Sequence, residues 1–154
     1  MDALNVCRDT PENPEVQALL TRHFALMRAS SPEESCHVME PGALLERGVL
    51  LFAARDGGTV LGVGALARLE AGHGELKSMH TAAEARGRGV ARAILSALLE
   101  AARSDEMTRV SLETGSAEMF AHARALYAAH GFEERQHIGD YVLAPLSVFK
   151  TRMI

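Results

Sequence analysis

A glycine-rich turn constrains the fold of this chain more than any other feature of its sequence. The segment Arg86-Gly87-Arg88-Gly89-Val90-Ala91 stands between a strand-like run, 75–81, and an amphipathic helical pattern, 90–103. A strand, a tight turn and a long helix in succession are typical of α/β proteins. The first amides of a helix lack partners within the helix and lie at the positive end of its dipole. The turn therefore predicts an anion site suited to phosphate or pyrophosphate, with a plain structural turn as the alternative.

Two common phosphate-binding loops do not fit this turn. A Walker loop requires Gly-Lys-Ser or Gly-Lys-Thr, and the sequence contains neither tripeptide. A dinucleotide-binding fingerprint requires a small residue three places after Gly89, where this chain has Arg92. The turn is thus expected to hold phosphate in a site of another type.

Composition narrows the class of protein. The chain has 154 residues, of which 47% are hydrophobic and 23% charged, and this predicts one globular domain spanning 1–154. A net charge of −4 gives no support for a nucleic-acid partner. No apolar run approaches the roughly 20 residues of a membrane helix, and the first residues do not resemble a signal peptide. Cys7 and Cys36 are expected to be free thiols, which favours a cytoplasmic location.

Hydrophobic periodicity predicts an alternation of strands and helices. Strands are expected at 3–8, 49–55, 59–69, 75–81, 109–113 and twice within 133–153, and helices at 14–28, 90–103 and 117–130. Asp56-Gly57-Gly58 indicates a hairpin turn, Ser116 a helix N-cap, and Gly131 a helix end. The polar segment 29–40 is expected to be a loop, and 42–47 a helical turn. Because a helix connects them, strands 75–81 and 109–113 should be parallel. The predicted fold is a mixed α/β sheet, mostly antiparallel, flanked by helices.

Two motifs resemble those of the GNAT superfamily of acyl-CoA N-acyltransferases. Arg86, Gly89 and Ala91 match its Arg/Gln-x-x-Gly-x-Gly/Ala signature, on the expected strand-to-helix turn. Ala123-x-x-Leu126-Tyr127 followed by Gly131-Phe132 matches the second signature. Three further stretches, 27–35, 111–115 and 139–141, are similar to a subgroup of small bacterial acetyltransferases. The chain departs from the family at Phe120, where many members have an Asn that helps to hold pantetheine; Thr114 and Ser116 are candidate substitutes.

The resemblance implies acetyl-CoA as cosubstrate and no metal. The pyrophosphate would bind the amides of the glycine turn, and the pantetheine would pair with strand 75–81 in a gap between splayed strands. A bulge in that strand would explain why Leu76 and Met79 both look core-facing. The residues expected to bind the cofactor are Met79, His80, Thr81, Arg86, Gly87, Arg88, Gly89, Val90, Ala91 and Tyr127. The side chain of Arg92 is a further candidate.

The implied reaction requires a base and a group that stabilises the leaving thiolate. An alkyl ammonium has a pKa of about 10 and must lose a proton before it attacks the thioester. Glu75 is at the strand position where the family often has its carboxylate base, and His80 and His73 are alternatives. Tyr127 is at the family's usual proton-donor position. Because a phenol is a weaker acid than a thiol, a hydrogen bond to the thiolate describes its role better than full proton transfer.

The acceptor is expected to be a primary amine of a small molecule or an amino acid derivative. The loop after the first helix and the tail near 140 are the segments expected to select it. The residues predicted to contact it are Arg28, Glu34, His37 and Tyr141. A non-catalytic CoA-binding sensor, or an O-acyl or longer-chain acyltransferase on the same scaffold, remains an alternative. Homodimers are common in the family, so a homodimer is included among the expectations.

Overall fold

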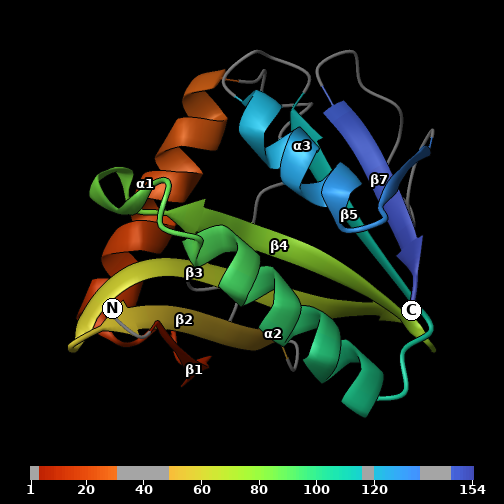
Figure 1. Cartoon of the computed structure of the whole chain (residues 1–154), viewed down its shortest axis with the longest axis horizontal. Helices are drawn as coiled ribbons and strands as arrows, with labels where there is room; N and C mark the ends of the chain where they lie inside the picture. Colours follow the sequence, from red (N-terminus) through yellow and green to blue (C-terminus); the bar gives the residue numbers. More distant parts are fainter. Residues whose placement is uncertain (1–3, 31–48, 116–119, 136–146) are drawn as a thin grey trace.

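The computed structural model describes residues 4–30, 49–115, 120–135 and 147–154 (Figure 1). In chain order its elements are β1 (Asn5–Asp9), α1 (Pro14–Ser30), β2 (Leu50–Asp56), β3 (Thr59–Glu70), β4 (His73–Thr81), α2 (Val90–Ser104), β5 (Arg109–Gly115), α3 (Ala121–Ala129), β6 (Glu133–Arg135) and β7 (Ser147–Met153). A short 3-10 helix, Ala83–Ala85, precedes the glycine turn. This order confirms the predicted alternation of strands and helices.

The strands form a seven-stranded sheet with the order β1-β2-β3-β4-β5-β7-β6. Neighbouring strands are antiparallel except β4 and β5, which are parallel and are joined by α2. A parallel pair needs a crossover connection, and α2 provides it. The structure therefore confirms both the mixed, mostly antiparallel sheet and the single parallel pair.

The hairpin between β2 and β3 shows how the sequence determines the sheet locally. Gly57 and Gly58 have φ values of +59° and +95°, as a two-residue hairpin turn requires and as glycine adopts without steric cost. No atom lies within 4 Å of a Cβ built on either residue, so the turn is open to solvent.

The two faces of the sheet carry different helices. α2 packs closely on β3, because a Cβ on Gly62 would lie 2.5 Å from Val90 Cγ1. The opposite face of β3 and β4 contacts α1, where His23 meets His80. In Figure 1, α2 and α3 lie in front of the sheet. The most deeply buried large side chains include Val16, Val63, Leu66, Val90, Ile94, Leu95, Leu98, Val110, Leu112 and Phe149.

Some sequence predictions differ from the structure, and others fall outside the described residues. β4 begins at His73, so His73 and Gly74 belong to a strand and the turn is Ala71-Gly72. Helix α3 begins at Ala121, with Phe120 as its N-cap residue, four residues after the predicted start at 117. Helix α1 continues to Ser30, so the predicted loop 29–40 does not begin at 29. The rest of that loop, the predicted helical turn 42–47 and the predicted cap Ser116 lie outside the described residues. No helix within the described part of the chain is long and apolar enough to cross a membrane.

Candidate active site

The parallel strands β4 and β5 pair along only part of their length. Their register runs from His73 opposite Arg109 to Leu76 opposite Leu112, and no pairing between them continues beyond that point in the described residues. Figure 1 shows the two strands starting together near the C-terminus of the chain and diverging toward their arrowheads. A cavity of about 1220 Å³ is lined by residues on both sides of this gap. The splayed sheet implied by the resemblance is therefore present.

A β-bulge in β4 determines which side chains face each side of this gap. Val63 of β3 is opposite His80, whereas Ala65 is opposite Lys77, so β4 contains one extra residue. The bulge lies at Ser78, which has a φ of +57°, an uncommon value for a residue other than glycine. The bulge confirms the prediction made from Leu76 and Met79. It also places Glu75, Lys77 and His80 on the α1 face of the sheet.

The glycine turn leaves the start of α2 accessible. Gly87 and Gly89 have φ values of +82° and +79°, and Gly89 is the N-cap residue of α2. No side chain caps this helix end within the described residues, and the first helical hydrogen bond runs from the Ala93 amide to the Gly89 carbonyl, 3.0 Å. A Cβ on either glycine would meet no atom within 4 Å. The amides that precede Ala93 at the start of α2 therefore have no partner within the helix, as an anion site requires.

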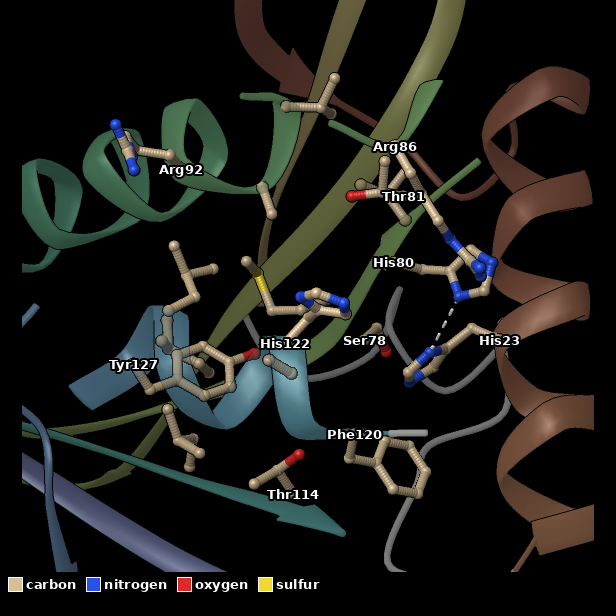
Figure 2. A pocket seen from close by; sticks show the side chains of 18 of the residues that line it. His23, Ser78, His80, Thr81, Arg86, Arg92, Thr114, Phe120, His122 and Tyr127 are labelled. Atoms are coloured by element: carbon tan, nitrogen blue, oxygen red, sulfur yellow. Dashed lines mark hydrogen bonds between the residues drawn. The ribbon is translucent and has the colours of Figure 1, made fainter. Parts of the chain in front are cut away.

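The arginines around the turn point in different directions. Arg86 and Arg92 line the cavity, and Figure 2 shows Arg86 on the same side as His80. Arg88 instead forms an ion pair with Asp56 of the β2–β3 hairpin, 2.7 Å from nitrogen to oxygen. Its side chain is not among those that line the cavity, although Gly87 and Gly89 on either side of it are. The Arg88 guanidinium therefore stabilises the contact between the turn and the hairpin.

Tyr127 enters the cavity from α3. Its side chain is only 6% exposed, and its ring packs edge-on against Phe132 with the centroids 5.9 Å apart. Burial raises the pKa of the Tyr127 hydroxyl above its usual range, so the phenol keeps its proton. In Figure 2 the hydroxyl is directed toward the middle of the cavity, and Thr114 and Phe120 lie nearby on the same side. Thr114, one of the two candidate substitutes for the missing Asn, is thus at the cavity.

Glu75 and Lys77 form a buried ion pair in the cavity wall. The residue Glu75 is 3% exposed, and the Lys77 ammonium lies 3.1 Å from its Oε2. Both residues line the cavity from the α1 face of β4. The residue predicted as the base is therefore at the expected place, with its carboxylate in contact with an ammonium group.

Two histidines meet on the same face. Nδ1 of His23, from α1, lies 3.4 Å from Nδ1 of His80, from β4 (Figure 2). Burial, and to a lesser extent His80, lowers the pKa of His23 to about 4. Burial, followed by the positive charges of Arg86 and Arg22, lowers the pKa of His80. Both rings are therefore neutral near pH 7. Sequence analysis did not single out His23, although it lies four residues after Leu19 on the apolar stripe of α1.

His73, the other histidine considered as a base, belongs to a separate network. Arg109 donates to its Nδ1 at 3.0 Å, which leaves Nε2 to donate to the Ser111 hydroxyl at 2.6 Å. The Ser111 hydroxyl also contacts the Thr151 hydroxyl at 2.7 Å. His73 is 4% exposed and does not line the cavity. Its role is to connect β4, β5 and β7.

The residues predicted to contact the acceptor are mostly beyond the described part of the chain. Glu34, His37 and Tyr141 lie outside it, and Arg28 is in the last turn of α1 with a side chain that the structure does not describe. Leu26 and Met27, from the same turn, do line the cavity. The cavity therefore reaches the end of α1. Cavity residues that sequence analysis did not single out include His23, Leu26, Lys77, Glu113 and His122.

Comparisons with known proteins agree with the fold. Residues 14–132 match the acetyltransferase (GNAT) family. The chain is 40% identical over 141 residues to the uncharacterized N-acetyltransferase YedL of Escherichia coli (strain K12), covering 92% of this chain and 89% of that protein. It is 33% identical over 150 residues to an IAA acetyltransferase of Azospirillum brasilense, covering 97% of each. The solved structure of PaiA N-acetyltransferase from Thermoplasma acidophilum in complex with coenzyme A has a TM-score of 0.75 at 14% identity, over 99% of each chain.

The chain belongs to the GNAT family of acetyltransferases, since the family match spans most of its length. It is therefore an acyltransferase. The family and the fold are those that the two sequence motifs predicted.

Proposed function

We propose that this protein transfers the acetyl group of acetyl-CoA to a primary amine of a small molecule or an amino acid derivative. The observation that carries the proposal is the cavity at the gap between β4 and β5. It is lined continuously from the glycine turn, through the open edge of β4, to Tyr127. A diphosphate, a pantetheine arm and a thioester would need these three environments in this order.

The two ends of the cofactor fit different parts of the cavity. The uncapped amides at the start of α2 suit the pyrophosphate, and Arg86 and Arg92 add positive charge there. After Leu76, β5 no longer pairs with β4, and the open edge of β4 suits the pantetheine amides. These amides would pair with the backbone of Met79 and Thr81 as an added strand. The coenzyme A complex of the PaiA enzyme, which shares this fold, supports the same type of ligand here.

The chemical steps follow from this placement. The amine loses a proton and attacks the thioester carbon, so that a carbon–nitrogen bond forms and the carbonyl oxygen becomes negative. The amide of Met79 or His80, beside the bulge, is our candidate to stabilise that oxygen. The carbon–sulfur bond then breaks and the thiolate leaves. Tyr127 donates a hydrogen bond to the sulfur, a role favoured by its raised pKa, because the phenol stays protonated.

The base and the acceptor contacts are proposed from the sequence. Glu75 is the base predicted from the sequence, and it lines the cavity together with His80. Arg28, Glu34, His37 and Tyr141 remain our predicted acceptor contacts. Because the chain is similar to an IAA acetyltransferase, IAA belongs in the panel of acceptors to be tested. Action in the cytoplasm and assembly as a homodimer also remain predictions.

A thiol-release assay tests the proposal. Purified protein is mixed with acetyl-CoA and a panel of amines, amino acid derivatives and alcohols, and free CoA and acylated products are measured. We expect CoA release with at least one amine and a base-stable amide product by mass spectrometry. Calorimetric binding of acetyl-CoA without release on any acceptor would support a sensor instead. A base-labile ester product, or faster turnover with longer acyl-CoA, would support the other acyltransferase alternative.

Tyr127→Phe tests the assigned role of the phenol. We expect kcat to fall by about 10- to 100-fold, the scale of one lost hydrogen bond to a developing charge. The dissociation constant of acetyl-CoA should change by less than about threefold, because the ring and its packing against Phe132 remain. Unchanged kcat would leave Tyr127 with a packing role alone.

A further inference from the structure

The pair His23–His80 joins the helix α1 to the catalytic strand β4 within the candidate active site. Both rings line the cavity, and their Nδ1 atoms are 3.4 Å apart (Figure 2). The rings cross at an interplanar angle of 72°. His23 is 9% exposed, so the pair is shielded from solvent on the α1 side. Within the described residues, the His80 ring has no other hydrogen-bond partner. A role for this pair rests on the proposed acetyl transfer.

Two neutral imidazoles joined through their Nδ1 atoms share a single proton. One Nδ1 must donate and the other must accept, because a neutral ring carries only one N–H. If His80 donates, its Nε2 has a lone pair and can act as a base. If His23 donates, the Nε2 of His80 carries a proton and cannot. The contact therefore divides the possible tautomers into one arrangement that is competent for proton abstraction and one that is not.

The other two candidate bases are engaged elsewhere. The carboxylate of Glu75 contacts the Lys77 ammonium at 3.1 Å, so taking up a proton would weaken that ion pair. His73 accepts from Arg109 through Nδ1 and donates to Ser111 through Nε2, which uses both of its nitrogens. His80 differs from both because one nitrogen is held by His23 and the other has no partner within the described residues.

We propose that His80 accepts the proton of the acceptor amine on Nε2, directly or through one water, and that His23 is the positioning residue that holds His80 in the competent tautomer. In this arrangement His80 Nδ1–H donates to His23 Nδ1, and His23 carries its own proton on Nε2. The amine loses a proton as its nitrogen forms the bond to the thioester carbon. That proton resides on His80 and passes to solvent or to the departing thiolate.

Charges around the pair make the hydrogen bond to His23 important. Arg86 and Arg22 oppose a positive charge on His80. Glu75 and Lys77 face the same side of β4 and form an ion pair with each other. When His80 takes up a proton, its bond to the neutral His23 becomes charge-assisted, and such bonds are shorter and about twice as strong as neutral ones. His23 thus offsets part of the repulsion from the two arginines.

The tautomers can be measured directly and without an acceptor. Long-range ¹H–¹⁵N spectra of the full-length protein distinguish Nδ1–H from Nε2–H rings, and His23→Gln and His80→Gln variants assign the signals. Near pH 7, with and without acetyl-CoA, we expect the Nδ1–H form for His80 and the Nε2–H form for His23. The reverse pair of tautomers in both states would overturn the proposal.

Kinetic measurements then test whether His80 is a general base or has only a structural role. With the panel amine that gives the fastest CoA release, His80→Gln should lower kcat by about 100-fold, the lower range of general-base effects. It should also abolish the acid limb of the pH–rate profile. His23→Leu, which cannot accept a hydrogen bond, should lower kcat about tenfold, and His23→Gln, which can accept one, should restore most of that loss. KM for acetyl-CoA should change little in all three.

Glu75→Gln tests the alternative that Glu75 is the base. We expect it to retain the acid limb that His80→Gln loses. If Glu75→Gln abolishes the limb while His80→Gln keeps both the limb and the rate, Glu75 is the base and the proposal is wrong. Absence of CoA release from the unaltered protein on every acceptor would instead refute the proposed function, and with it this role for the pair.

Discussion

The strands β4 and β5 are paired at one end and separated at the other. We call residues 73–76 of β4 with 109–112 of β5 the closed end, and residues 77–81 with 113–115 the open end. At the closed end the strands pair in register, and side chains of β4, β5 and β7 are linked by hydrogen bonds from His73 through Ser111 to Thr151. At the open end the pairing stops, β4 bulges at Ser78, and the cavity begins.

His73 and His80 show the difference most clearly. Both project from the α1 face of the same strand, and burial lowers the pKa of each. Both nitrogens of His73 are used within the closed end, whereas His80 meets one other histidine at the edge of the cavity. The same residue type can therefore stabilise the sheet or remain available for chemistry, depending on whether its strand is still paired. The comparison predicts that changes at the open end should affect ligands, and changes at the closed end should affect stability.

The largest effect is expected from Gly89→Val at the open end. A side chain at this N-cap residue would stand where the pyrophosphate must approach the amides of α2, so the affinity for coenzyme A should fall by about a thousandfold, or about 4 kcal/mol. Isothermal titration calorimetry measures this loss. The substitution also strains a residue with a φ of +79°, which costs about 1–2 kcal/mol of stability.

Gly57→Val separates these two contributions. Gly57 has a φ of +59° and, like Gly89, no atom within 4 Å of a Cβ built on it, but it lies in the β2–β3 turn. The Gly57→Val variant should lose about as much stability as Gly89→Val and keep its affinity for coenzyme A. Unchanged affinity in folded Gly89→Val would refute the assignment of the glycine turn.

The next largest effect concerns pH and the histidine at the open end. His23 has a pKa of about 4 in the folded protein, against an ordinary value of 6.5. The unfolded chain therefore binds more protons between these values, and stability should fall as the pH drops from 6.5 to 4. The lowered pKa corresponds to a loss of about 3 kcal/mol. Urea unfolding at pH 7, 5.5 and 4 measures it.

His23→Leu tests whether that loss belongs to His23. The pH dependence of its unfolding free energy should be flatter than that of the unaltered protein. A residual slope of the same sign is expected, because burial also lowers the pKa values of His73 and His80. An identical slope in His23→Leu and the unaltered protein would show that His23 is not buried as the structure describes.

Local sequence patterns predicted most of the fold because they depend on neighbouring residues. The glycine turn, the Gly57-Gly58 hairpin and the bulge inferred from Leu76 and Met79 all follow from short-range geometry. The predicted start of β4 was wrong because it depends on a residue elsewhere in the chain. Gly72-His73-Gly74 looks like a turn, but Gly74 is a strand residue that lets Met107 approach, with a Cβ placed 2.5 Å from its sulfur.

The candidate site was less predictable because it depends on distant contacts. The motifs located Arg86, Gly89 and Tyr127 at the cavity, and the strand position located Glu75. The contact between His23 and His80 joins residues 57 positions apart and exists only because α1 packs on β4. The ion pair of Arg88 with Asp56 likewise depends on the hairpin folding beside the glycine turn. No periodicity within one segment contains that information.

Ser111→Ala should produce a smaller effect, at the closed end. It removes the hydroxyl that accepts from His73 and contacts Thr151, leaving buried polar groups unsatisfied. We expect a loss of about 2 kcal/mol in the free energy of unfolding. The affinity for coenzyme A should be unaltered, because Ser111 does not line the cavity. Ser104→Ala, at the exposed end of α2, should change stability by less than about 0.5 kcal/mol. A large loss of affinity in Ser111→Ala would show that the two ends are not independent.

The smallest effect distinguishes two arginines within the glycine turn. Arg86 lines the cavity, whereas the Arg88 guanidinium is paired with Asp56 at 2.7 Å. Arg86→Ala should weaken coenzyme A binding about fivefold, or about 1 kcal/mol, because a partly exposed charge contributes modestly. That loss should shrink at high salt, because salt screens the attraction between Arg86 and the cofactor phosphates in the unaltered protein. Arg88→Ala keeps its backbone amide and should weaken binding by no more than about twofold, with its main effect on the contact between the turn and the hairpin. If Arg88→Ala weakened binding more than Arg86→Ala, the guanidinium of Arg88 would have to leave Asp56 when the cofactor binds, and the hairpin would then be part of the binding site.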